Sequence, residues 1–181
     1  GWGGTQSHDG NSAIIAPGGN SWVQSVEVVE SRFPWLVHRF GLRPDSGGPG
    51  RHRGGLGIVR EMEATVTVQV NGLSDRFIVP AGGLAEGKAA ATGELLIQRN
   101  GDPTWRSVVE EGLSPSPSKF AGVTLEPGDR LRLGTPGGGG YGDPLRRDPE
   151  ALQRDIDEGY VSLAAAREHY GYRPPDGEVE A

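Results

Sequence analysis

The residues best suited to chemistry lie in two glycine-rich stretches. The first runs from Phe40 to Gly57 and contains seven glycines. Its polar members that could bind or brace are Arg43, Asp45, Ser46, Arg51 and Arg53. Guanidinium groups donate planar, charge-assisted hydrogen bonds to carboxylates and carbonyls. They can therefore fix this stretch in one shape or contact a substrate, and arginine beside aspartate in a glycine-rich turn favours the bracing role.

The second stretch, Thr135 to Pro144, contains four successive glycines followed by Tyr141. Ordering each glycine costs about 1 kcal/mol more than ordering an alanine, so if the stretch is ordered something must hold its backbone closely. An unconstrained flexible segment is the alternative, which the stiff residues Pro136, Tyr141 and Pro144 disfavour. We expect neighbours outside this chain to hold both stretches, which would place them at a subunit interface or near a substrate. In the second stretch this applies to Gly138, Gly139, Gly140 and Tyr141, whose hydroxyl is the best candidate to reach a ligand.

Two weaker motifs have simpler interpretations. His8 and Asp9 form the only adjacent His-Asp pair, but a metal or acid–base site needs further ligands at a recognisable spacing, so a bracing role is favoured. Lys88 follows Gly87, as in a phosphate-binding loop, but Ala89 stands where the Mg²⁺-binding hydroxyl should be. The four histidines share no common spacing, and the sequence assigns no catalytic residue and no metal ligand.

Periodicity predicts the elements that position these stretches. Before the first stretch, we expect a helix over Ser25–Phe33, ended by Pro34, and a strand over Trp35–Leu42. After it, Leu56–Val70 predicts a strand, Asn71-Gly72 a hairpin turn, and Ser74–Val79 the return strand.

Further strands are predicted over Glu94–Arg99 and Trp105–Val109, and a tight β-turn unit joins Phe120–Leu125 to Arg130–Leu133. The spacing of apolar residues then changes from the period of a strand to that of a helix. Asp148 and Ser162 cap two short helices, of which the second closes at Gly171.

The predicted fold class is mainly β with a short C-terminal αα-hairpin, an α+β chain rich in loops and glycine. The expected divisions are an irregular lead-in over 1–24, a β-rich domain over 25–145, the helical hairpin over 146–172 and a mobile tail over 173–181.

Composition excludes several classes of protein. The net charge is −6 and the arginines are scattered, so we expect no nucleic-acid partner. No apolar run approaches the roughly 20 residues of a membrane span, and no leader peptide is evident. The absence of cysteine favours a cytoplasmic protein. The chain opens on Gly1-Trp2 rather than methionine, so we expect a fragment or a processed piece.

Four motifs, taken together, resemble the C-terminal part of the hydantoinase B/5-oxoprolinase family, which includes acetone and acetophenone carboxylase subunits. They are Leu42–Gly57, Leu125-x-Pro127-Gly128-Asp129, Thr135–Pro144 and Asp148-Pro149-Glu150. The resemblance covers nearly the whole chain, and the order of its two glycine-rich motifs is specific. Between Gly10 and Ser25 the chain departs from the common pattern: where many members have a stretch rich in His and Thr/Asn, this chain reads Asn-Ser-Ala-Ile-Ile-Ala-Pro-Gly-Gly-Asn-Ser-Trp.

The resemblance implies a multi-subunit enzyme in which an A-type subunit uses ATP to activate a cyclic amide or a ketone. The B-type subunit then opens the ring or carboxylates the ketone at a metal site in its long N-terminal part. We therefore expect this chain to bind no cofactor and to be inactive alone, with ATP and a divalent metal held elsewhere in the complex. Its expected partners are the A-type subunit and the N-terminal part of the B-type subunit. A non-catalytic, β-rich assembly or binding module remains the alternative.

Overall fold

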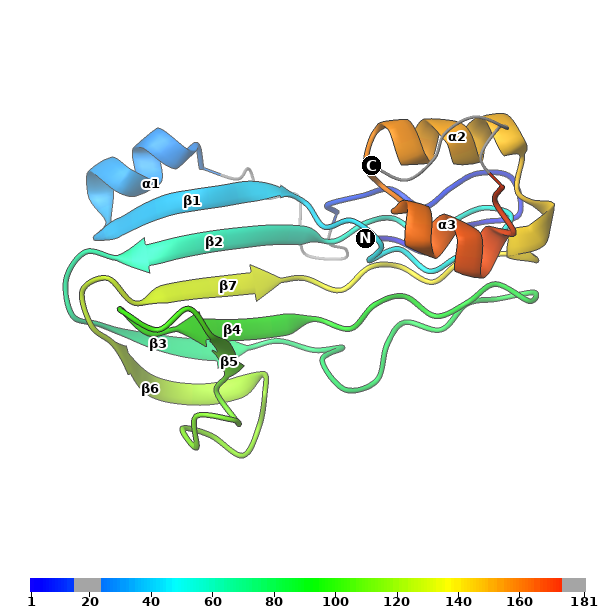
Figure 1. The fold of residues 1–181 in the computed structure, drawn as a ribbon. Coiled ribbons are helices and arrows are strands. Elements are labelled where there is room, and N and C mark those ends of the chain that lie inside the picture. The colour runs from blue at the N-terminus through cyan, green and yellow to red at the C-terminus, as the bar shows by residue number, and fades with distance from the viewer. Residues whose placement is uncertain (15–23, 174–181) are drawn as a thin grey trace.

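The computed structural model describes residues 1–14 and 24–173, and its strands form two antiparallel sheets (Figure 1). The strands are β1 Trp35–Leu42, β2 Ile58–Ala64, β3 Val68–Leu73, β4 Glu94–Gln98, β5 Trp105–Ser107, β6 Lys119–Leu125 and β7 Arg130–Gly134. The larger sheet has the order β1-β2-β7-β4-β5, and the smaller sheet pairs β3 with β6.

The main core lies between the two sheets. Ala64, Ile97 and Leu131 of the larger sheet pack with Val123 and Leu125 of β6, and all five are buried. Full burial of a side chain such as Ile97 or Leu125 stabilises the fold by about 1.5–3 kcal/mol. The smaller sheet therefore holds the strands of the larger one in place, and the glycine-rich stretches continue from those strands.

Helices lie at both ends of the molecule. Helix α1 spans Val26–Arg32, and near the C-terminus a 3₁₀ turn, η1 (Pro144–Arg146), leads into α2 (Pro149–Asp157) and α3 (Leu163–Tyr170). The predicted caps are confirmed. The side chains of Ser25, Asp148 and Ser162 accept hydrogen bonds from the first turns, and Gly171 ends α3 with a φ of +67°. The mainly β, α+β fold class is also confirmed.

The hairpin predicted at Asn71-Gly72 is wrong, because both residues lie inside β3. Gly72 is needed there for packing: a Cβ at this position would lie 2.3 Å from Cε1 of the Phe120 ring. The Asn71 side chain accepts a hydrogen bond from the Gly122 amide, 2.8 Å away, beside a shift in the strand register. The chain turns earlier, at Thr65–Thr67, where β2 leaves the larger sheet, and no strand forms over Ser74–Val79.

The turn between β6 and β7 is confirmed, with Gly128 at a φ of +88°. The two strands do not pair with each other, however. β6 pairs with β3, whereas β7 lies between β2 and β4 in the other sheet. The predicted turn unit is therefore a crossing between layers. The predicted tail beyond residue 173 and part of the lead-in, 15–23, fall outside the described residues.

Candidate functional site

Four segments that are distant in the sequence run side by side beyond one end of the strands of the larger sheet, beneath α2 and α3 (Figure 1). We call this region the glycine-packed end; it comprises residues 1–14, 43–57, 81–93 and 135–143. Backbone hydrogen bonds join the segments. The Gly138 amide donates to Gly55 O at 2.9 Å, the Gly48 amide to Gly138 O at 2.8 Å and the Gly140 amide to Lys88 O at 3.0 Å.

The glycines here are required for close approach of backbones. A Cβ on Gly54 would lie 1.7 Å from the Gly138 carbonyl oxygen, and one on Gly138 would lie 1.9 Å from that of Trp2. Gly139 and Gly140 show the same crowding, at 1.9 and 2.0 Å from the oxygens of Gly82 and Pro49. These distances are far below any real Cβ contact, so only glycine fits.

This packing corrects one expectation. We predicted that neighbours outside the chain hold the two glycine-rich stretches, whereas the stretches contact each other and two further segments of the same chain. Inter-segment hydrogen bonds, each contributing about 1 kcal/mol, offset the entropy lost by the ordered glycines. The contacts that order both stretches therefore come from this chain itself.

A buried ionic network ties this end to the helical hairpin. Arg147 donates to both oxygens of Asp9, at 2.9 and 2.7 Å, and to Asp155 Oδ2 at 2.6 Å. Arg53 donates from Nε to Asp155 Oδ1 at 3.0 Å. The side chains of Arg147 and Arg53 are 2% and 8% exposed. Separating any of these partners would leave a buried charge unpaired, which costs several kcal/mol. The network therefore holds the lead-in, the first stretch and α2 in fixed positions relative to one another.

The network alters the pKa of its members. Burial by itself raises the pKa of Asp9, but the hydrogen bonds and charge of Arg147, with the charge of Arg53, outweigh burial and hold that pKa below its usual value. Burial raises the pKa of the neighbouring Tyr170 to about 12. Asp9 is therefore a carboxylate, and Tyr170 a neutral phenol, at neutral pH.

The turn at Arg43–Ser46 is braced from several sides. Arg43 donates to the carbonyls of Thr92 and Thr135, and the fully buried Ser46 hydroxyl donates to Arg43 O and accepts from the Gly57 amide. Asp45 takes a left-handed φ of +58°, and its Oδ1 accepts from the Ser162 amide at the start of α3. This turn therefore connects the larger sheet to the hairpin.

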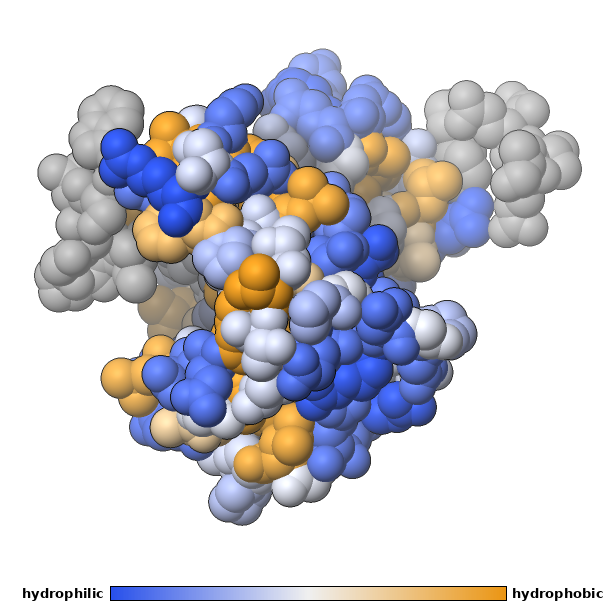
Figure 2. Space-filling model, turned by 90° about the vertical axis from the view of Figure 1, so that its left-hand side faces the viewer, coloured by the Kyte–Doolittle hydropathy of each residue, from blue (hydrophilic) through white to orange (hydrophobic). Residues whose placement is uncertain are grey.

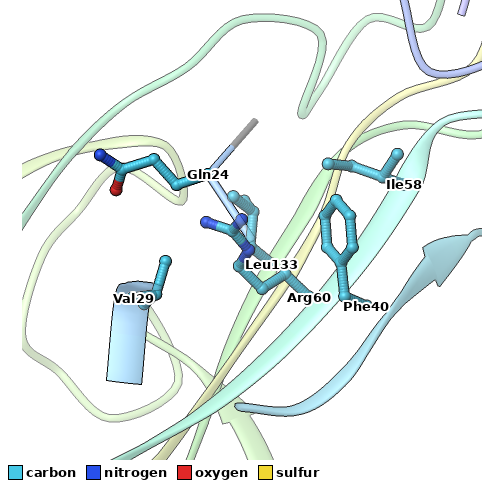
Figure 3. Close-up of a pocket in the computed structure, with 6 residues that line it drawn as sticks. All are labelled: Gln24, Val29, Phe40, Ile58, Arg60 and Leu133. Atoms are coloured by element: carbon cyan, nitrogen blue, oxygen red, sulfur yellow. The ribbon is translucent and has the colours of Figure 1, made fainter. Parts of the chain in front are cut away.

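Two concave regions of the described chain bear on the site, of which the first lies directly against these segments. A cavity of about 240 Å³ lies between the first stretch, Ala89–Ala91 and α3, where His169 and Tyr170 line it. A second, of about 280 Å³, lies between α1 and the larger sheet; Figure 3 shows the Arg60 guanidinium there beside Phe40 and Leu133. Among residues 1–14 and 24–173, no three His, Asp or Glu side chains are placed to hold a metal ion. Over the same residues, no helix is long and apolar enough to cross a membrane.

Comparison with known proteins now identifies the family. The family model described as hydantoinase B/oxoprolinase matches residues 1–144. The chain belongs to the hydantoinase B/oxoprolinase family. It spans about a quarter of the B-type relatives that it matches, so it corresponds to one segment of a longer family chain.

Family relatives are similar in both sequence and structure. The chain is 35% identical over 150 residues to the beta subunit of the caprolactamase of Pseudomonas jessenii, covering 81% of this chain and 24% of that subunit. It is 30% identical to a B-type D-/L-hydantoinase chain of Pseudomonas sp., covering 98% and 28%. The solved structure of ATP-dependent caprolactamase from P. jessenii matches with a TM-score of 0.66 at 28% identity, covering 86% and 26%. A nucleotide-free acetone carboxylase has the same fold, with a TM-score of 0.74 at 24% identity, covering 95% and 26%.

The structure brings the predicted site residues of this family member together at the glycine-packed end. Arg43 and Arg53 have the bracing role that was favoured, and so does Asp9. Ser46 and Gly138–Gly140 are buried. Arg51 is exposed and Tyr141 half-buried, so a contact with a partner or a substrate stays a prediction for these two. Glycines 82 and 87, which suggested a phosphate loop, pack on the second stretch, and no helix follows Lys88.

Sequence reasoning missed Arg147 and Asp155. Asp155 is three residues after Leu152, on the buried face of α2. A carboxylate on the apolar face of an amphipathic helix signals a buried partner, and this signal could have led to the network.

Proposed function

We propose that this chain is the C-terminal segment of a B-type subunit in an ATP-dependent, multi-subunit enzyme of the hydantoinase B/oxoprolinase family. The match of the family model over residues 1–144 carries the proposal. Those residues fold into the two sheets and the glycine-packed end, so the matched region forms one connected structural unit. The segment acts as a rigid support for a site completed by the remainder of the subunit.

The substrate class that we propose is a cyclic amide, hydrolysed after activation by ATP. The names of the sequence relatives support it, because hydantoin, caprolactam and 5-oxoproline all contain a ring amide. Carboxylation of a ketone is the second candidate, and the fold shared with acetone carboxylase favours it.

In this proposal the chemistry uses groups supplied by other parts of the complex. ATP is bound by an A-type subunit, and a divalent metal is held outside this segment, whose described residues do not fit a metal site. Arg51 and Tyr141 are the exposed or half-buried predicted residues that we assign to contact with a partner or substrate. The use of ATP and the absence of cysteine both fit a cytoplasmic complex.

Reconstitution tests the proposal. The A-type subunit and the N-terminal part of the B-type subunit are purified with and without this chain, and the complex is measured by size-exclusion chromatography. Turnover is followed as ATP hydrolysis dependent on hydantoin, caprolactam or 5-oxoproline, and as incorporation of labelled bicarbonate with acetone. We expect both the complex and one of these turnovers to require the chain. Failure to form a complex, with turnover unaffected by omitting the chain, contradicts the proposal.

A complex whose turnover does not need the chain would instead support the non-catalytic assembly module. Reconstitution thus separates three outcomes: part of the enzyme, assembly module, or unrelated protein.

A further inference from the structure

An unusual concentration of exposed apolar side chains runs from the last residue of β3 into the glycine-packed end. Four of the five most exposed large hydrophobic residues of the described chain fall within residues 73–84; the fifth is Leu145. We call these four the apolar ledge: Leu73, Ile78, Val79 and Leu84, exposed by 85, 77, 66 and 68%. Beyond these five, the exposed large hydrophobic residues are at most 50% exposed. Exposed apolar side chains gathered along one segment of a surface typically mark an interaction site.

The backbone that carries the ledge is held on its inner side. The Ser74 amide donates to Ser118 O at 3.0 Å, the Gly93 amide to Arg76 O at 2.9 Å and the Leu84 amide to Gly140 O at 2.9 Å. Phe77, between the exposed residues, points inward and packs on Gly93, where a Cβ would lie 2.4 Å from the ring. The segment runs along the border of the molecule from β3 to the glycine-packed end (Figure 1). The backbone that carries the exposed side chains is therefore held in place by the rest of the chain.

The backbone also contains local strain. Arg76, Ala85 and Glu86 adopt left-handed φ values of +62, +48 and +77°, although none is a glycine. Such conformations cost about 1 kcal/mol or more each and persist where the surroundings enforce them. The inner side of this segment is hydrogen-bonded to the rest of the chain, and its outer side carries apolar side chains. Such a segment is preorganised for binding, since its backbone needs little further ordering when a partner binds.

We infer that the apolar ledge is the surface on which the N-terminal part of the B-type chain docks. This inference rests on the proposed function. The B-type relatives are about three and a half times as long as this chain, so most of their polypeptide lies outside this segment and must contact it somewhere. The partner surface has an apolar centre, and polar groups at its margin complement the exposed Asp75–Lys119 pair, whose charged atoms are 3.6 Å apart.

A second copy of this chain fits the ledge less well. The net charge of −6 makes two copies repel each other at neutral pH. The N-terminal part of the B-type chain therefore remains the occupant to which the inference commits.

The control surface lies at the opposite end of the molecule. Figure 2 views the end that carries α1, where hydrophobic side chains are interspersed with hydrophilic ones. Val66, in the connection between β2 and β3, is 50% exposed there and provides a matched substitution.

The test uses the complex of this chain with the A-type subunit and the N-terminal part of the B-type chain. The variant Ile78→Ser/Val79→Ser should weaken binding by about tenfold or more, since central apolar residues carry most of the energy of an interface. The melting temperature of the isolated chain should not fall, because both side chains are exposed. Val66→Ser should leave both quantities unchanged.

Cross-linking identifies the occupant. The chain contains no cysteine, so Val79→Cys and Val66→Cys each provide a single site for a photoactivated cross-linker. We expect position 79, but not position 66, to cross-link to the N-terminal part of the B-type chain. Unchanged affinity of the serine variant, or cross-links from position 79 to the A-type subunit or to a second copy, overturn this inference and leave the proposed function standing. A wild-type chain that forms no complex refutes the proposed function itself.

Discussion

Adding one methyl group inside the glycine-packed end should destabilise the whole chain. In Gly54→Ala, the new Cβ would lie 1.7 Å from the Gly138 carbonyl oxygen, whereas an ordinary contact needs at least 3.4 Å. The two segments must separate by the difference, 3.4 − 1.7 = 1.7 Å. The hydrogen bonds that join them are 2.8 and 2.9 Å long and cannot survive a shift of that size.

The expected loss follows from these two effects. Overpacking costs about 1–3 kcal/mol, and two lost hydrogen bonds cost about 1 kcal/mol each, so the free energy of unfolding should fall by about 3–5 kcal/mol. For a chain of this size each kcal/mol corresponds to roughly 2–4 °C, so the melting temperature should fall by roughly 6–20 °C. Circular dichroism during heating, and urea unfolding followed by tryptophan fluorescence, measure both quantities.

Gly82→Ala is the matched control, because it lies in the same region but has no atom within 4 Å of the position that its added methyl group would occupy. Its melting temperature should stay the same or rise slightly, since alanine restricts the unfolded chain. Equal melting temperatures for Gly54→Ala and Gly82→Ala would refute the idea that backbone contact holds this end together.

Three further predictions concern the polar residues. Arg147→Met should lower the free energy of unfolding by about 3–5 kcal/mol, because it leaves Asp9 without its guanidinium partner and Asp155 with Arg53 alone, whereas the exposed neighbour Arg146→Met should change it little; equal losses in urea unfolding would contradict this. Because the folded pKa of Asp9 lies below the unfolded value of 3.8, its contribution to stability is present above that pH and is lost as the pH falls through the folded pKa. Unfolding free energies measured from about pH 5 downward should therefore fall less steeply for Asp9→Asn than for the wild type, and parallel curves would count against the network. Arg51→Ala should leave the melting temperature unchanged but reduce turnover or affinity of the reconstituted complex, since its side chain is exposed; full activity would remove Arg51 from the proposed contact residues.

Local sequence was sufficient wherever a short-range cause decides the structure. Ser25, Asp148 and Ser162 cap helices because their side chains bond amides within the next few residues. The strand Trp35–Leu42 was predicted with its observed bounds, since alternation and the preceding Pro34 both act locally. The bracing roles of Arg43, Arg53 and Asp9 were also predicted from residue chemistry, although their partners were not.

Only the tertiary structure decided what the glycines do. Gly72 looked like part of a hairpin but makes room for the Phe120 ring, and the glycines of the two rich stretches make room for each other's backbones. Arg147 and Asp155 meet Asp9 and Arg53 across as many as 138 residues of sequence. A glycine carries no side chain whose pattern reveals its neighbours, and an ion pair between distant residues leaves no periodic signal. The contacts of these glycines and ion pairs can therefore be identified only in the folded chain, where the strands bring distant segments together.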